Sequence, residues 1–353
     1  LEIRLRLPPP PPRSQGDRAA DRLGDLVSVH QTARVLLVGG SGFIGQRLSA
    51  TLLERGRSVR NFDTQPSQVT GIEAIIGDVL DTAALATAAR GCDTIINLAA
   101  VHRDDVRPLS RYEEVNVGGA HSVVAAAEAS GIRHITFTSS VAVYGLDKHD
   151  VTEDSLPEPF NEYGRTKLLA EEVFNAWAAA DENRTLTIVR PSVVFGEGNR
   201  GNVYTLARQV TSGRFLMIGR GANAKSMSYV GNIAEYLADT VESPSTLTVN
   251  YADKPDLTTN ELVATIRASL GARAGRRLAV PLPIGLAAGH AFDLLARVSG
   301  RTFPISAVRV RKFVADTSVN TSRLEATGYR PKYDLRDAIG RTVTAEFGAR
   351  QSR

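Results

Sequence analysis

The sequence predicts an α/β protein built on a doubly wound parallel sheet, with a smaller C-terminal lobe. First, apolar runs of strand length, rich in β-branched residues, alternate with stretches of helical apolar spacing from Ala33 to Pro191. Second, these runs are apolar almost throughout rather than at every other position. Strands covered by helices on both faces have this composition, because both of their faces are buried.

Each predicted element follows from this periodicity. Strands are expected at residues 34–40, 58–63, 73–78, 94–100, 134–140 and 185–191. Helices are expected at residues 46–56, 81–91, 119–131 and 164–180, where apolar residues recur every three or four positions. After Pro191 the regularity weakens, and glycine-rich and proline-rich segments indicate a loop-rich lobe, where substrate-binding loops commonly lie.

The chain is expected to divide into a cofactor-binding domain and a substrate-binding lobe. The domain spans residues 33–190, with a later return near 229–252, and the lobe comprises mainly residues 191–350. Residues 1–32 are expected to form a disordered tail, since the five consecutive prolines Pro8–Pro12 favour extended backbone.

The tail also bears on where translation starts. The chain begins with Leu1, and its first methionine is Met217, deep inside the predicted fold. We expect the native start to be a non-ATG codon read here as Val27 or Val29. The residues before it would then be translated upstream sequence and not native.

Composition excludes several classes of function. The net charge of +4 is modest, and no basic stripe with interleaved aromatics is present, so we expect no nucleic-acid partner. The stretch closest to a membrane span, Leu278–Ala296, is interrupted by prolines, a histidine and an aspartate. It predicts a loop and a core-facing helix, and no membrane partner is expected. The single cysteine, Cys92, excludes an internal disulfide, predicts a buried core residue and favours a cytoplasmic location.

The glycine-rich turn in "VLLVGGSGFIGQRL" is the clearest chemical signal. Gly39, Gly42 and Gly45 directly follow a predicted strand and open a helix, as in a Rossmann dinucleotide-binding turn. Glycines allow close approach of a pyrophosphate, which the helix N-terminus stabilises. Asp63 ends the next strand, 18 residues after Gly45, where a carboxylate accepts hydrogen bonds from adenosine ribose hydroxyls. Because this carboxylate repels a 2′-phosphate, the motif predicts NAD rather than NADP.

Tyr163 and Lys167 form a second signal. They are four residues apart at the start of a predicted helix and therefore share one face. A nearby ammonium favours the phenolate form of a tyrosine, so the pair is either a tuned acid/base or an ordinary surface pair. The spacing alone leaves both interpretations open.

The G-x-x-G-x-x-G spacing, taken with Tyr163 and Lys167, resembles the short-chain dehydrogenase/reductase superfamily. More narrowly, the chain from about Ala33 to about Phe347 is similar to the extended NAD-dependent nucleotide-sugar epimerases and dehydratases. The segments "GDV", "NLAA", "VNVGG" and "FTSSVAVYG" match the family's cofactor and catalytic segments. The resemblance implies these cofactor-binding residues: Gly39, Gly42, Phe43, Ile44, Gly45, Asp63, Asp78, Val79, Ala99, Ala100, Asn116, Tyr163, Lys167 and Pro191.

The resemblance also implies three catalytic residues. Tyr163 is the base that removes a sugar hydroxyl proton, and Ser140 hydrogen-bonds the reacting oxygen. Lys167 binds the nicotinamide ribose and lowers the pKa of the tyrosine. The implied substrate contacts are Ser140, Asn202, Lys225 and Arg309. No metal site is expected.

These residues favour NAD-dependent epimerisation, at C4, of a nucleotide-activated hexose through a transient 4-keto intermediate. Val141 and Ala142 stand where the family's 4,6-dehydratases carry Asp-Glu, which disfavours a dehydratase. The alternatives are an NAD(P)H-dependent ketosugar reductase, a hydroxysteroid-type dehydrogenase and a non-catalytic NAD-binding regulator. The expected partners are a UDP-hexose and a second copy of the chain, contacted through the helices near Gly118–Ser130 and Thr166–Ala180.

Overall fold

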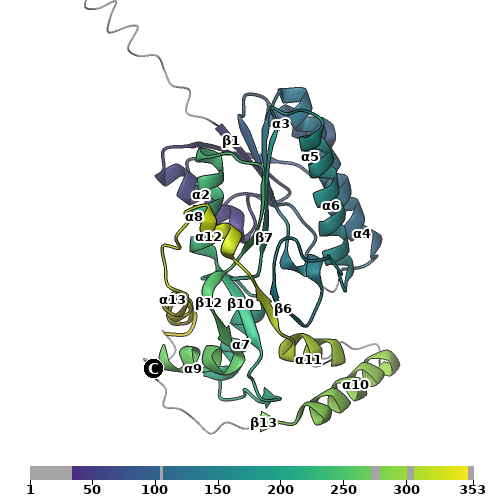
Figure 1. Ribbon diagram of the computed structural model, residues 1–353, viewed down its shortest axis with the longest axis vertical. Coiled ribbons are helices and arrows are strands. Elements are labelled where there is room, and N and C mark those ends of the chain that lie inside the picture. The colour runs from purple at the N-terminus through teal and green to yellow at the C-terminus, as the bar shows by residue number, and fades with distance from the viewer. Residues whose placement is uncertain (1–33, 104–105, 272–278, 300–305, 349–353) are drawn as a thin grey trace, which may run out of the picture.

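The computed structural model describes residues 34–103, 106–271, 279–299 and 306–348 (Figure 1). The tail predicted at residues 1–32 lies outside the described residues. In Figure 1 a large sheet and its helices occupy the upper part of the molecule, and a smaller lobe lies below them.

The large sheet has seven parallel strands in the order β11-β7-β5-β4-β1-β2-β3. They are β1 (Arg34–Val38), β2 (Ser58–Asp63), β3 (Glu73–Ile76), β4 (Thr94–Asn97), β5 (His134–Thr138), β7 (Thr185–Pro191) and β11 (Leu247–Tyr251). The six strands expected from the sequence are confirmed. The strand order reverses between β1 and β4, and ligands of such sheets bind at the carboxyl ends of the strands beside this point.

Helices cover both faces of this sheet (Figure 1). One face carries α3 (Thr82–Ala89), α5 (Gly119–Ser130) and α6 (Glu162–Ala179), and the other carries α2 (Phe43–Glu54), α8 (Val230–Glu242) and α12 (Ser322–Ala326). Phe137 of β5 and Phe174 of α6, both buried, pack with ring centroids 4.6 Å apart. The doubly wound fold class is therefore confirmed.

The smaller lobe is built around a second sheet with the order β12-β10-β14-β6, to which β8 adds by pairing with β10. Its strands are β6 (Lys148–Val151), β8 (Val193–Phe195), β10 (Ala224–Tyr229), β12 (Asp253–Thr258) and β14 (Thr317–Val319). Helices α7 (Asn202–Thr211), α9 (Thr259–Ala268) and α13 (Leu335–Phe347) enclose its apolar core. The chain crosses between the lobes: β6 comes from the first half of the sequence, whereas α8 and β11 return to the large sheet.

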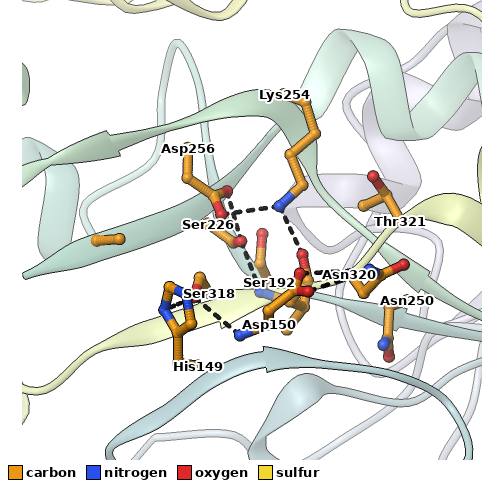
Figure 2. Close-up of polar contacts among 12 residues, drawn as sticks. His149, Asp150, Ser192, Ser226, Asn250, Lys254, Asp256, Ser318, Asn320 and Thr321 are labelled. Carbon is orange, nitrogen blue, oxygen red and sulfur yellow. Dashed lines mark hydrogen bonds and ion pairs between the residues drawn. The ribbon is translucent and has the colours of Figure 1, made fainter.

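Polar side chains tie the small sheet together (Figure 2). Asp256 accepts hydrogen bonds from the Ser226 hydroxyl at 2.6 Å and from the Lys254 ammonium at 2.8 Å. Lys254 also donates to the backbone oxygen of Val319 at 2.5 Å, and the amide of Val319 donates to Ser226 at 3.0 Å. These bonds join strands that lie far apart in the sequence, so they hold β10, β12 and β14 in one arrangement.

The remaining elements are short or peripheral. Around the large sheet are α4 (Ser110–Glu113), a π-helical turn (Glu114–Gly118) and a 3₁₀ turn (Val141–Tyr144). In the lower lobe, β9 (Met217–Ile218) pairs with β13 (Ala279–Val280), followed by α10 (Leu282–Ser299) and α11 (Ala307–Val314). Within Leu278–Ala296 the expected loop is replaced by β13 at Ala279–Val280, with Leu278 outside the described residues; the expected helix is present as α10, but it does not face the core. Ile284, Leu294 and Leu295 are exposed, because the glycine face of α10 packs inward instead.

Candidate active site

The turn between β1 and α2 has the geometry of an anion cradle. Gly39 has a φ of +82°, and a Cβ there would lie 2.6 Å from the backbone nitrogen of Ala99. A Cβ on Gly45 would lie 2.5 Å from the Cα of Gly40, so neither position tolerates a side chain. Among the described residues, no side chain caps the N-terminus of α2 at Gly42. The N-terminal amides and helix dipole therefore face a position suited to a phosphate group.

Phe43 and Ile44, the first residues of α2, contact different parts of the fold. Phe43 packs against the apolar cluster of the small lobe, and Ile44 packs into the cluster between the large sheet and α8. The helix that opens the cradle is thus anchored to both lobes.

Asp63 lies beside the cradle at the end of β2. Its carboxylate accepts hydrogen bonds from the amides of Ser41 and Gln65, each at 2.9 Å. Asp78 and Val79 follow β3 along the same edge of the sheet. The Asp78 carboxylate accepts from the amide of Leu80 at 3.0 Å, and Val79 is buried.

Asn116 organises the loop that leaves β4. Its side chain accepts a hydrogen bond from the amide of Val101 at 2.8 Å and donates to the oxygen of the same residue at 3.1 Å. It also donates to the Thr166 hydroxyl of α6 at 2.9 Å. Asn116 lies in the π-helical turn, an irregularity that is frequent at functional sites. The loop carrying Ala99 and Ala100 is therefore tied to the helix that carries Tyr163 and Lys167.

The first turn of α6 brings Tyr163 close to Ser140. Asn161 caps this helix by accepting a hydrogen bond from the amide of Gly164 at 2.9 Å, and Tyr163 is its second residue. Burial raises the pKa of Tyr163, and a hydrogen bond from the Ser140 hydroxyl lowers it. In this arrangement Ser140, rather than Lys167, opposes the effect of burial on the pKa of the phenol.

Lys167 is buried one turn further along α6, with 2% of its surface exposed. Its ammonium donates to the backbone oxygen of Thr138 at 2.7 Å and lies 4.5 Å from the centroid of the Phe137 ring. Burial lowers its pKa to about 7, and the charge of Glu171 acts in the opposite direction. Tyr163 and Lys167 are thus not an exposed surface pair.

A buried charged network supports the same helix, and the sequence pattern did not indicate it. The guanidinium of Arg190 donates two hydrogen bonds to the carboxylate of Glu171, at 2.9 and 2.6 Å, and a third to the hydroxyl of Tyr144 at 2.6 Å. Tyr144 in turn donates to Asn250 at 2.7 Å. The available signal was a carboxylate at the spacing of the buried helix face and an arginine directly before Pro191.

The predicted substrate contacts are less closely grouped. Pro191 is buried at the end of β7, where it pairs with Tyr251 of β11. Lys225 donates to the backbone oxygens of Lys312 and Ala315, at 3.0 and 2.5 Å, and burial lowers its pKa to about 8. These bonds direct Lys225 toward the end of α11 rather than toward Ser140 or Tyr163. Asn202 and Arg309 are exposed, on α7 and α11 respectively.

The sequence is similar to that of a sugar epimerase over most of both chains. The chain is 45% identical over 316 residues to the N-acetyl-alpha-D-glucosaminyl-diphospho-ditrans,octacis-undecaprenol 4-epimerase of Escherichia coli O157:H7, covering 89% of this chain and 95% of that protein. It is also 34% identical over 228 residues to a 3 beta-hydroxysteroid dehydrogenase/Delta 5-->4-isomerase of Mycobacterium tuberculosis (strain ATCC 25618 / H37Rv), covering 60% and 61% of the two chains.

Solved structures share the fold. The UDP-glucose 4-epimerase of Thermus thermophilus, in complex with NAD, superposes with a TM-score of 0.71 at 21% identity, covering 90% of this chain and 99% of that one. The sequence model of the NAD dependent epimerase/dehydratase family matches residues 35–250. The protein therefore belongs to the NAD dependent epimerase/dehydratase family.

Proposed function

We propose that this protein is an NAD-dependent 4-epimerase of N-acetylglucosamine carried on a polyprenyl diphosphate. The supporting observation is the 45% identity to the E. coli enzyme named for that reaction, which extends over nearly the whole of both chains. The nucleotide-activated hexose expected from the sequence also carries a sugar on a diphosphate. The two substrates differ in the group on the other side of the diphosphate, which is a nucleoside in one and a polyprenyl chain in the other.

The residues around the cradle fit NAD. Gly39 and Gly45 leave no room for side chains, no described side chain caps the N-terminus of α2, and Asp63 lies next to the turn. The pyrophosphate would be held at Gly39, Gly42 and Gly45, and the adenosine ribose at Asp63. Held there, NAD would supply the hydride acceptor and donor that exchange of configuration at C4 of the sugar requires.

Tyr163 and Ser140 handle the proton of the sugar hydroxyl. Tyr163 takes the proton from the 4-hydroxyl as the carbon becomes a ketone, and gives a proton back when the alcohol forms again. The hydrogen bond from Ser140 and the N-terminus of α6 both favour the phenolate that this step requires. Lys167, fixed by Thr138, supplies a cation next to the reacting groups when protonated.

Val141 and Ala142 support epimerisation over dehydration. They form the first residues of the 3₁₀ turn that Ser140 caps, through a hydrogen bond from the amide of Ala142 to the Ser140 hydroxyl at 3.1 Å. Neither side chain carries a proton that could be transferred. Elimination of water would need an acid and a base at this point, and this segment supplies none.

Lys225 is the proposed diphosphate contact, and its existing hydrogen bonds limit how it can bind a phosphate. Two of its three N–H groups are engaged by backbone oxygens, which leaves one for a phosphate oxygen. The carbonyl contacts fix the ammonium at the C-terminus of α11. A compact point charge there can neutralise a diphosphate without a bidentate grip.

Incubation of the purified protein with substrates and no added cofactor tests the proposal. The candidates are N-acetylglucosaminyl-diphospho-undecaprenol, UDP-N-acetylglucosamine and UDP-glucose, with the sugar product identified by NMR after mild acid release. Formation of the galacto-configured sugar from the lipid-linked substrate alone supports the proposal. Turnover of UDP-sugars alone would instead assign the nucleotide-activated substrate. Consumption of a ketosugar only when NADH is supplied would assign a reductase, and no chemistry at all would leave a regulator.

The proposed assembly is a homodimer in the cytoplasm. The helices expected at its interface, α5 and α6, lie side by side on one face of the large sheet (Figure 1). Light scattering of the purified protein tests this, and a monomeric mass would remove the dimer. Cys92 is buried and forms no disulfide, which is compatible with a reducing compartment; fractionation of the source cells would test this location.

A further inference from the structure

Helix α10 exposes an apolar face that no other described part of the chain covers. Its exposed alanine, isoleucine and leucine residues follow helical spacing over three turns, and Pro283, His290 and Ser299 are exposed beside them. The residues with helical spacing are Ile284, Ala287, Ala288, Ala291, Leu294 and Leu295. The three large side chains are 60%, 63% and 49% exposed, in that order. This face carries no charge among the described side chains, which is the reverse of the pattern expected for a surface helix.

The opposite face of α10 is packed, so the exposed face cannot simply turn inward. A Cβ on Gly285 would lie 2.7 Å from the Ile218 side chain, and one on Gly289 would lie 2.8 Å from the Cα of Ala307. The carboxylate of Asp293 accepts a hydrogen bond from the amide of Ala307 at 3.0 Å, at the start of α11. Close glycine packing and this cap hold α10 in its orientation.

The neighbouring helix α11 adds cations beside the apolar face. Val308 is 55% exposed, and Arg309 and Arg311 are exposed on the same short helix. A depression of about 270 Å³ between the two helices is lined by His290, Asp293, Leu294, Ala307, Val308 and Arg311. The sequences of α10 and α11 together contain four cationic residues, Arg297, Arg309, Arg311 and Lys312, against the single carboxylate Asp293.

We propose that the α10–α11 pair docks the protein on the surface of an anionic phospholipid bilayer. Apolar side chains at helical spacing insert at the boundary of headgroups and acyl chains, and adjacent cations attract anionic headgroups. In Figure 1 α10 runs along the lower right edge of the molecule, away from the large sheet. Because the three cations of α11 (Arg309, Arg311 and Lys312) give this helix pair an excess of positive charge, an anionic surface matches this face better than a second copy of the chain would.

Contact with the bilayer is peripheral. Among the described residues, none of the helices combines the length and the hydrophobicity that a membrane span requires. The sequence predicted no membrane partner, and it is the exposure of α10 in the folded chain that leads to a different inference.

The position of Lys225 connects the docking surface with the substrate, an extension that rests on the proposed function. The ammonium of Lys225 donates hydrogen bonds to the backbone oxygens of Lys312, near the end of α11, and of Ala315, the residue that follows this helix. A lipid-linked sugar diphosphate has its charged group at the headgroup level of the bilayer. Docking through α10 and α11 would therefore bring the proposed diphosphate contact to the depth where that group lies.

Sedimentation with vesicles, without any substrate, tests the docking surface. We expect the wild-type protein to bind vesicles of mixed phosphatidylglycerol and phosphatidylcholine, to bind phosphatidylcholine alone more weakly, and to be released by salt. The double variant Leu294→Glu/Leu295→Glu should bind at least about tenfold more weakly, since charges replace the inserted side chains. Leu156→Glu, at a 76% exposed leucine outside both helices, is the matched control and should bind as wild type does.

Absence of wild-type binding to anionic vesicles would overturn the inference, as would equal binding by the double variant. If the wild type forms an oligomer, the double variant is monomeric and neither binds vesicles, the face would be a contact between copies of the chain, which would also overturn the inference.

Measuring turnover separates this inference from the proposed function. The double variant should lose activity on the undecaprenyl substrate in vesicles but retain it on a short-chain, water-soluble analogue. Vesicle binding without turnover of either substrate would reject the proposed function and leave the docking surface standing.

Discussion

Helices α6 and α10 have the same length, 18 residues, and opposite relations to solvent. Helix α6 buries Lys167 and Glu171, whereas α10 exposes Ile284, Leu294 and Leu295. Hydrophobic burial alone would expose the two charged side chains and bury the three apolar ones. Both departures therefore require an explanation in terms of what the side chains contact.

For α6 the explanation lies within the chain. Lys167 has the oxygen of Thr138 as a partner, and Glu171 has the guanidinium of Arg190. Buried charges persist when they are paired and hydrogen-bonded, and here the pairing places a lysine next to Tyr163. For α10 no described part of the chain covers the exposed residues, so the partner we propose is external. Buried charges that are paired within the chain thus point to a catalytic role for α6, whereas the exposed apolar face of α10 points to binding of an external partner.

The largest effect should come from the hydroxyl on α6. Tyr163→Phe is expected to lower the 4-epimerase kcat by about a thousandfold, because the proton of the substrate hydroxyl then has no acceptor. Product analysis by NMR gives the rate, and the thermal unfolding temperature checks the fold. Tyr333→Phe is the control, since Tyr333 packs edge-on against Tyr229 in the small lobe. A Tyr163→Phe enzyme as active as the control would remove Tyr163 from the proposed chemistry.

The next effect concerns the buried ion pair of α6. Glu171→Ala should lower the free energy of unfolding by about 3–5 kcal/mol, because Arg190 stays buried without its carboxylate. Urea unfolding measures this. Glu172→Ala, at the adjacent exposed position, should change stability by less than about 0.5 kcal/mol. The double variant Glu171→Leu/Arg190→Met should recover much of the loss, and a double variant as unstable as the single one would contradict the role of the unpaired arginine.

A pH dependence should distinguish Lys167 from an exposed lysine. Its pKa falls from 10.5 to about 7 in the folded protein because of burial. Between these values the unfolded chain binds a proton that the folded chain does not, so lowering the pH through this window reduces stability. The stability of the wild type relative to Lys167→Met should fall by about 1.4 kcal/mol per pH unit there. Urea unfolding across the window, without added nucleotide, would show parallel curves if the lysine stayed protonated.

The smallest effect is expected on α10. Leu295→Ala should change the free energy of unfolding by less than about 0.5 kcal/mol, since the side chain is already half exposed. Phe174→Ala, on the buried face of α6, should cost about 3–5 kcal/mol in the same assay. A large loss of stability in Leu295→Ala would mean that α10 packs against the chain and would weaken the comparison of the two helices.

Much of the large sheet could be predicted from the sequence. Its parallel strands are buried on both faces, so each appears as a continuous apolar run, and β1, β5 and β7 lie where such runs stand. The glycine turn and the Tyr163/Lys167 spacing were also readable, because tight turns and helix faces depend on residues a few positions apart. The small sheet was not, since β6 and β14 come from distant segments and are joined through polar contacts.

The sequence by itself determined the doubly wound sheet, the cradle at Gly39 and the residues at the start of α6, because local spacing and continuous hydrophobicity encode them. Only the tertiary structure decided which charges meet and which surfaces remain uncovered. It paired Glu171 with Arg190, bound Lys225 to the carbonyls at the end of α11, and turned the apolar face of α10 outward. These outcomes depend on contacts between segments far apart in the chain, which no local pattern specifies.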